Sequence, residues 1–294
     1  MKKYLLLLLV ASSFTKAETF NVSTAQEFRS ALTVAASNGQ NDIIKVDAVN
    51  VSTQDDGLGG FIFQSEEDFS LTISGIENSV LDGNSSNPIL YINTPGSATI
   101  DGVTFQNGYS ESASGALTID SGQQAFVTNS IFTNNITGDD GGAFKFIGDN
   151  YSVSNSTFSN NQATIHGGAI YSYDAKNIVI ENSTFEGNTA DVMGGAIMIH
   201  GNITSVVATI EDSIFKLNSA SEGGAVSLST HSSSDTYVIN FIDNVFDSNT
   251  SAGRGGCIDT EKANIVRNDF KNCVSGTAGN SSHGQGGAIW GGAS

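Results

Sequence analysis

The stretch that decides the fold is Asn129-Ser-Ile-Phe-Thr-Asn-Asn-Ile-Thr-Gly-Asp-Asp-Gly-Gly-Ala143. It contains two short phrases, Phe-x-x-Asn and Gly-Gly-Ala, separated by a polar turn. Both phrases recur in alternation along the rest of the chain. The first occurs at Phe132/Asn135, Phe158/Asn161, Phe185/Asn188, Phe215/Asn218 and Phe246/Asn249. The glycine pair occurs at Gly141-Gly142, Gly167-Gly168, Gly194-Gly195, Gly223-Gly224, Gly255-Gly256 and Gly286-Gly287.

The spacing of the repeat predicts a solenoid. Successive phenylalanines of the phrase lie 26, 27, 30 and 31 residues apart, a period typical of arrays of small stacked units. Between the phrases the apolar residues alternate as in strands, and no helix-period segment separates them. Because crossovers between parallel strands are right-handed in about 98% of cases, we predict an all-β, right-handed parallel β-helix. Residues 43–294 would form roughly nine coils, with regular repeats from about residue 105.

Each residue of the repeat has a structural reason to recur. The phenylalanines are expected to point inward and stack from coil to coil, each contributing about 1.5–3 kcal/mol of burial. The asparagine suits a turn, because it tolerates a left-handed backbone and its amide can bond the asparagine one coil away. The paired glycines suit a bend where φ is positive or a Cβ would clash.

The N-terminal residues predict export and a cap. Met1-Lys2-Lys3, an apolar run and small residues up to Ala17 are typical of a secretory signal peptide over residues 1–17. Thr24-Ala-Gln-Glu27 is a capping-box pattern before a helical apolar period. We therefore expect an N-terminal cap over 18–42 whose short amphipathic helix covers the open end of the apolar stack.

Composition excludes several function classes. The formal net charge is −18, and the chain has only three arginines: Arg29, Arg254 and Arg267. Such a chain repels nucleic acids and acidic glycans, so we predict no nucleic-acid partner. No apolar run reaches the ~20 residues that a spanning helix needs, so no transmembrane segment is predicted. No cofactor is predicted either.

The two cysteines, Cys257 and Cys273, fall within one repeat. Cys257 replaces the alanine of the glycine phrase, and Cys273 replaces the asparagine that would follow Phe270. In a secreted chain such a pair suggests a disulfide. Two buried free thiols are the alternative, since pairing requires a short Cα separation.

Used together, the two phrases resemble the repeat of the chlamydial-type polymorphic outer-membrane proteins, over about residues 105–290. The resemblance implies a surface-exposed, right-handed β-helix adhesin. The region from Phe20 to Gly83 is similar, more weakly, to the N-terminal part of pectate-lyase-like β-helix proteins. Those adhesins continue into a membrane translocator, whereas this sequence stops at Ser294, directly after a repeat phrase. This favours truncation of a longer protein.

Enzymes that act on polysaccharides also use this fold, so catalysis is the rival hypothesis. The best candidates are Asp139, Asp140 and His166, about one coil apart, which faintly resemble the carboxylates of polygalacturonase-type glycosidases. The corresponding turns of the next repeats carry other polar residues, which favours an ordinary turn. The remaining histidines are interpreted as turn or surface residues rather than metal ligands: His200, His231 and His283.

The sequence therefore predicts an adhesin or surface-display protein that is extracellular or at the cell surface, or in the outer membrane as part of a longer protein. Its expected partners are cell-surface glycans or proteins of another cell. A glycan hydrolase or lyase, and a structural fragment without ligand, are the alternatives.

Overall fold

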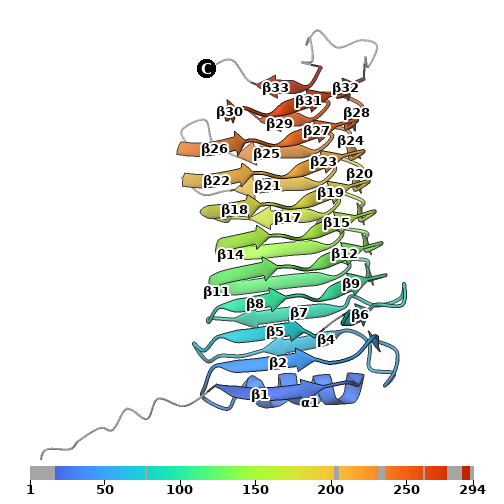
Figure 1. Cartoon of the computed structure of the whole chain (residues 1–294), viewed down its shortest axis with the longest axis vertical. Helices are drawn as coiled ribbons and strands as arrows, with labels where there is room; N and C mark the ends of the chain where they lie inside the picture. Colours follow the sequence, from blue (N-terminus) through green and yellow to red (C-terminus); the bar gives the residue numbers. More distant parts are fainter. Residues whose placement is uncertain are drawn as a thin grey trace, which may run out of the picture.

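A computed structural model of the chain describes residues 17–76, 78–201, 205–230, 236–260, 262–276 and 287–291. They form a right-handed parallel β-solenoid of about nine turns, with one short helix near the N-terminus. Figure 1 shows a rod in which the coils stack in sequence order from the blue N-terminal end to the red end. The predicted fold class is confirmed.

The described strands belong to three parallel sheets that run along the rod. The first is a 17-stranded sheet to which a regular coil contributes two consecutive strands, or one long bent strand as in β11 and β14. Its strands are β1 (Glu18–Val22), β2 (Asp42–Val46), β4 (Phe61–Gln64), β5 (Leu71–Gly75), β7 (Leu90–Thr94), β8 (Ala98–Asp101), β11 (Leu117–Thr128), β14 (Phe144–Ser154), β17 (Ile170–Tyr173), β18 (Asn177–Glu181), β21 (Ile197–Gly201), β22 (Ser205–Glu211), β25 (Val226–Thr230), β26 (Thr236–Ile242), β29 (Ile258–Thr260), β30 (Asn264–Val266) and β33 (Ile289–Gly291).

The other two sheets contain shorter strands, one per coil. The nine-stranded sheet contains β3 (Val51–Ser52), β6 (Val80–Asp82), β9 (Thr104–Gln106), β12 (Ile131–Thr133), β15 (Thr157–Ser159), β19 (Thr184–Glu186), β23 (Ile214–Lys216), β27 (Val245–Asp247) and β31 (Asp269–Lys271). The seven-stranded sheet contains β10 (Tyr109–Ser110), β13 (Ile136–Thr137), β16 (Gln162–Ala163), β20 (Thr189–Ala190), β24 (Ser219–Ala220), β28 (Thr250–Ser251) and β32 (Val274–Ser275).

A column of phenylalanines forms the centre of the core. Neighbouring rings stack nearly parallel, with centroids 4.7–4.9 Å apart, close to the spacing between strands. Their side chains point inward from the middle residue of seven strands of the nine-stranded sheet, from β9 to β31. The column consists of Phe105, Phe132, Phe158, Phe185, Phe215, Phe246 and Phe270.

The asparagines of the repeat form a second, polar column inside the coil. Asn188 is completely buried, its Oδ1 accepts hydrogen bonds from the backbone and side chain of Asn161, and its Nδ2 donates to the carbonyl of Phe158. The expectation that this asparagine itself adopts a left-handed backbone is wrong. The residue before it does so, as at Asn134, Asn160 and Gly187, because the chain must turn there to aim the amide inward.

In the five pairs from Gly141-Gly142 to Gly255-Gly256, the two glycines have different roles. The first has positive φ, for example 67° at Gly194, a conformation that costs glycine little. The second lies against the next coil: a Cβ on Gly195 would collide with the carbonyl oxygen of Gly224. The pair therefore combines a sharp turn with close approach between coils.

The N-terminal end is covered by α1 (Ala25–Ala35), which lies with β1 at the bottom, blue end of the rod in Figure 1. Thr24 and Glu27 form the capping box, and Phe28 packs on Phe61 with centroids 4.8 Å apart. β1 pairs with β2, so the large sheet already begins within the segment predicted as a cap. The predicted signal peptide, apart from Ala17, lies outside the described residues.

Near the C-terminal end, Cys257 and Cys273 form a disulfide with a Cα separation of 5.5 Å. Cys273 follows Phe270 at the position where the earlier repeats place asparagine, and the Nδ2 of Asn249 lies 3.4 Å from the sulfur of Cys257. The disulfide therefore lies next to Asn249, the last amide of the asparagine column. It joins the start of one coil, at Cys257, to the end of the same coil, at Cys273.

Candidate functional site

The outer face of the first strand of each coil, together with the turn before it, carries three columns of side chains along the rod. Strand pairing and backbone hydrogen bonds define the columns. The turn column is Asp140, His166, Met193, Glu222 and Arg254. The first outward column is Lys145, Tyr171, Met198, Ser227 and Asp259, and the second is Ile147, Tyr173, His200 and Ser229.

Within these columns, two of the predicted site residues are in direct contact. Nδ1 of His166 donates to Oδ1 of Asp140 at 2.8 Å, and the backbone N–H of His166 donates to the same oxygen at 3.2 Å. This pairing holds the imidazole with Nε2 on the side away from the carboxylate. The third predicted residue, Asp139, lies beside them and accepts a hydrogen bond from Lys145 at 3.0 Å.

Lys145 is shared between the two carboxylates. Its Nζ is 3.0 Å from Asp139 and 3.9 Å from Asp140, and it lies 5.4 Å from the ring centroid of Tyr171. The lysine side chain is only 15% exposed, so these contacts take place largely out of water, where charge pairs interact more strongly.

Tyr171 lies at the centre of the group, with 5% of its surface exposed. Its ring stacks between His166 and Tyr173, at centroid distances of 6.1 and 6.4 Å, and its hydroxyl is hydrogen-bonded to Nδ1 of His200 at 2.8 Å. Burial raises the pKa of the Tyr171 hydroxyl well above its usual range, and Asp140 adds to the effect. The hydroxyl is therefore neutral at physiological pH.

Tyr173 and His200 form the exposed edge of this group. Their rings meet edge to face at a centroid distance of 5.6 Å, and Tyr173 is 36% exposed. A flat ring beside carboxylates and imidazoles offers both an apolar face and directional polar groups, the combination found in sites for small polar molecules. We call this group the Tyr171 cluster: Asp139, Asp140, Lys145, His166, Tyr171, Tyr173 and His200.

The chain was compared with known proteins. A family model described as "Right handed beta helix region" matches residues 37–274. The chain belongs to this right-handed β-helix family. No curated protein and no solved structure matches this chain. The match supports the β-helix family as a whole, and the narrower likeness to chlamydial-type repeats stays a resemblance.

For this β-helix protein, sequence reasoning found part of the cluster. Asp139, Asp140 and His166 were predicted, but Lys145, Tyr171, Tyr173 and His200 were missed. His200, interpreted from the sequence as a turn or surface residue, lies half-buried on the outer face of β21. His231 and His283 lie outside the described residues. Aligning the repeats on Gly-Gly-Ala would have placed Lys145, Tyr171 and Met198 in one column.

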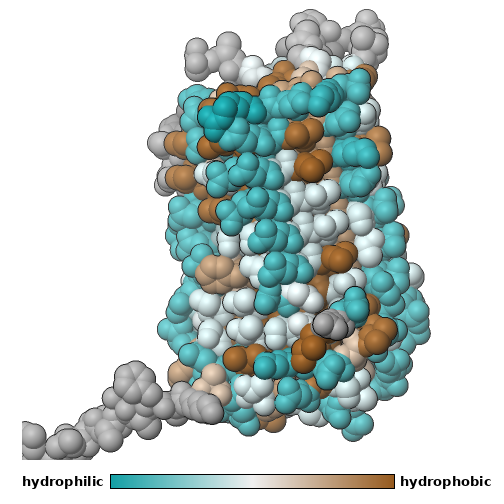
Figure 2. Space-filling model, in the orientation of Figure 1, coloured by the Kyte–Doolittle hydropathy of each residue, from teal (hydrophilic) through white to brown (hydrophobic). Residues whose placement is uncertain are grey.

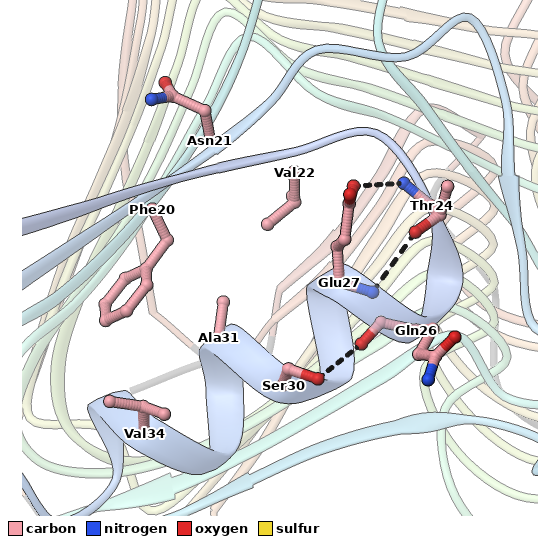
Figure 3. A pocket seen from close by; sticks show the side chains of 9 residues that line it. All are labelled: Phe20, Asn21, Val22, Thr24, Gln26, Glu27, Ser30, Ala31 and Val34. Atoms are coloured by element: carbon pink, nitrogen blue, oxygen red, sulfur yellow. Dashed lines mark hydrogen bonds between the residues drawn. The ribbon is translucent and has the colours of Figure 1, made fainter.

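The β-helix also has an open hollow of about 560 Å³ between β1 and α1, shown in Figure 3. Two of its polar residues are already used by the helix cap: Oγ1 of Thr24 accepts from the N–H of Glu27, whose carboxylate accepts from the N–H of Thr24. Hydrogen bonds from the backbone and side chain of Ser23, and to a smaller extent those with Thr24, hold the pKa of Glu27 below its usual value. The hollow is therefore a less suitable candidate than the Tyr171 cluster.

The following two statements, on metal ligands and on membrane-spanning helices, hold for the described part of the chain. Its His, Cys, Asp and Glu side chains form no group of three or more that could hold a metal ion. It also contains no helix long and apolar enough to cross a membrane. Figure 2 shows broad hydrophilic bands along the visible face of the rod, with apolar side chains between them singly or in small groups.

Proposed function

We propose that this β-helix protein acts at the cell surface or outside the cell as an adhesin, and that the Tyr171 cluster contacts a glycan. The observation that carries the proposal is the exposed ring of Tyr173, packed against His200 and against the ring of Tyr171, whose other side meets His166. The signal peptide predicted over 1–17 and the resemblance to surface adhesins support the location.

The chemistry of sugars suits such a group. A pyranose ring has an apolar face of C–H groups and a rim of hydroxyls, so its sites combine an aromatic surface with hydrogen-bonding side chains. In the cluster, Tyr173 supplies the surface, while Asp139 and His166 supply an acceptor and a second polar group. The hydroxyl of Tyr171 is hydrogen-bonded to His200, which packs against the ring of Tyr173 and so helps to position it. We call the exposed ring of Tyr173 the platform.

A glycan-binding assay tests this function. The chain from Glu18 onward would be applied to immobilised neutral, acidic and amine-bearing oligosaccharides, together with Tyr173→Ala and a control, Tyr109→Ala. Tyr109 is a similarly exposed tyrosine, at 38%, in β10 of another sheet. We expect binding that Tyr173→Ala abolishes and Tyr109→Ala retains. Binding that survives Tyr173→Ala, or that no oligosaccharide supports, would contradict the proposal.

A second candidate function is a glycan hydrolase or lyase, favoured by the contact between Asp140 and His166. A carboxylate that orients an imidazole is one way to hold a general base. The test is incubation with neutral and acidic polysaccharides, followed by assays for new reducing ends and unsaturated products. Turnover that Asp140→Asn abolishes would replace the adhesin proposal with this one, whereas binding without turnover would support adhesion.

A further inference from the structure

We infer that the glycan bound by the Tyr171 cluster carries protonated amino groups, as in chains of hexosamine with free amines, and is not a uronate. This inference rests on the proposed function. The observation behind it is that two carboxylates share one ammonium group next to Tyr171, and that the exposed ring of Tyr173 lies on the other side of Tyr171.

The charges around the platform come from few residues. Asp139 and Asp140 both lie against Lys145, so one ammonium group faces two carboxylates. His166 is bonded to Asp140, Asp174 follows Tyr173 in the chain, and Asp120 lies in the column of Ile147 and Tyr173, two coils before Tyr173. The side chain of Asp139 is 29% exposed, twice the 14% of Asp140. Asp139 is therefore the carboxylate that a ligand reaches first.

The raised pKa of Tyr171, caused first by burial, also reflects the negative charges around it. After burial, the causes that raise the pKa of Tyr171 are Asp140, Tyr173, Asp139 and Asp174. A negative group at this position is disfavoured by its surroundings. A uronate carboxylate placed on the platform would meet the same repulsion, while an ammonium group would be attracted.

The cluster already contains one ammonium group beside an aromatic ring. Nζ of Lys145 lies 5.4 Å from the ring centroid of Tyr171, within the range of a cation–π interaction. The neighbouring ring of Tyr173 is exposed, and carboxylates border the group. A ligand ammonium over Tyr173 would repeat the arrangement that Lys145 makes with Tyr171.

Two larger features agree with such a ligand. The chain has a net charge of −18, which attracts polycations and repels polyanions over a distance. The cluster also spans three successive coils, from Lys145 through Tyr171 to His200. Three coils span about 10 Å at the usual strand spacing, which accommodates a short extended oligosaccharide along the rod.

The experiment compares oligosaccharides of equal length: β-1,4-linked glucosamine, its N-acetylated counterpart and oligogalacturonate, at a pH where the amine is charged. We expect the glucosamine chain to bind at least about tenfold more tightly than the N-acetylated chain, and oligogalacturonate not to bind. Asp139→Asn and Asp140→Asn should each reduce this preference. Thermal melting of each variant would show that it is folded.

Glu186→Gln is the matched control. Glu186 pairs with Lys216 as Asp139 pairs with Lys145, but it lies in β19 of another sheet. Its variant should bind as the wild type does. If Glu186→Gln weakened binding as much as Asp139→Asn, the glucosamine chain would be attracted by the acidic surface of the rod in general and not by the cluster. The inference would then be wrong.

The outcomes also separate this inference from the proposed function. Equal or tighter binding of the N-acetylated chain, with loss in Tyr173→Ala, would contradict the amine preference and retain the glycan site. Tighter binding of oligogalacturonate would overturn the inference directly. Absence of binding for all three would contradict both.

Discussion

The asparagines of the repeat are polar side chains in the interior of the rod. Asn135, Asn161, Asn188, Asn218 and Asn249 are all completely buried, and the amides of the first four bond the coils on both sides. A buried amide is costly unless its donors and acceptor are satisfied. The column is therefore a ladder of hydrogen bonds that fixes the register of one coil on the next.

Replacing Asn188 with alanine should destabilise the protein. The change leaves the backbone and side-chain N–H of Asn161, and the carbonyl of Phe158, without their partner. Each buried group left unsatisfied costs about 1–3 kcal/mol. Asn177→Ala, at an exposed position of β18, is the control. In urea unfolding, equal midpoints for the two variants would contradict a stabilising role of the buried asparagine ladder.

Two tyrosines predict loss of stability at alkaline pH. Burial raises the pKa of both Tyr151 and Tyr171 above the ordinary value of 10.0. Above about pH 10 the unfolded chain releases these protons while the folded chain retains them, so the free energy of unfolding falls as pH rises. Tyr171→Phe should weaken this dependence. Thermal melting between pH 8 and 11, values that bracket about 10, would check it, and an unchanged slope in Tyr171→Phe would be contrary evidence.

Among the structural elements, the short strands of the nine-stranded sheet show most clearly how the fold is built. Its three-residue strands, β6 to β31, each have one inward side chain between two outward ones, as in the buried Phe185 of β19. Such strands bury little individually, so their stability comes from stacking on the coils above and below.

Phe185→Ala should therefore cost about 3–5 kcal/mol, the usual range for removing a buried aromatic side chain. The ring stacks on Phe158 and Phe215 at 4.9 Å on both sides. Ile214→Ala removes a side chain from the outer face of β23, where Ile214 is 44% exposed, and should cost less than about 0.5 kcal/mol. Chemical denaturation of both variants measures the difference. Similar costs would mean that the phenylalanine column is not the core.

The elements were predictable to the extent that the repeat determines them. The period of Phe132, Phe158 and Phe185 sufficed for the solenoid, because one inward residue per coil repeats in register. The direction of the asparagine side chain was not predictable, since the left-handed residue is variously Asn160, Gly187 or Leu217. A backbone position filled by such different residues leaves no clear pattern in one sequence.

On the scale of the whole rod, the site depends on neighbours that are far apart in the sequence. Asp140 and His166 could be proposed together because they occupy corresponding turns. The contact between Tyr171 and His200 could not, because it depends on which strand residues face outward in two adjacent coils. Residues of the same column gather on one face of the solenoid, and the sequence shows this only after the repeats are aligned.

The stability of a solenoid is approximately a sum over coils and their interfaces, so its ends open first. The disulfide between Cys257 and Cys273 ties one of the last described coils. Replacing both cysteines with alanine should cost about 3 kcal/mol, as expected for a loop of this length. Hydrogen exchange should become faster in β29 to β32 and stay unchanged in β2. Uniform acceleration along the rod would contradict this.

The central claim is that the Tyr171 cluster binds a glycan. Isothermal titration of glucosamine and N-acetylglucosamine oligosaccharides into the wild type, Tyr173→Ala and Tyr109→Ala tests it most directly. We expect saturable binding to the wild type and to Tyr109→Ala, and affinity at least about tenfold weaker for Tyr173→Ala. Equal affinity of all three proteins, or no heat of binding with any, would contradict it.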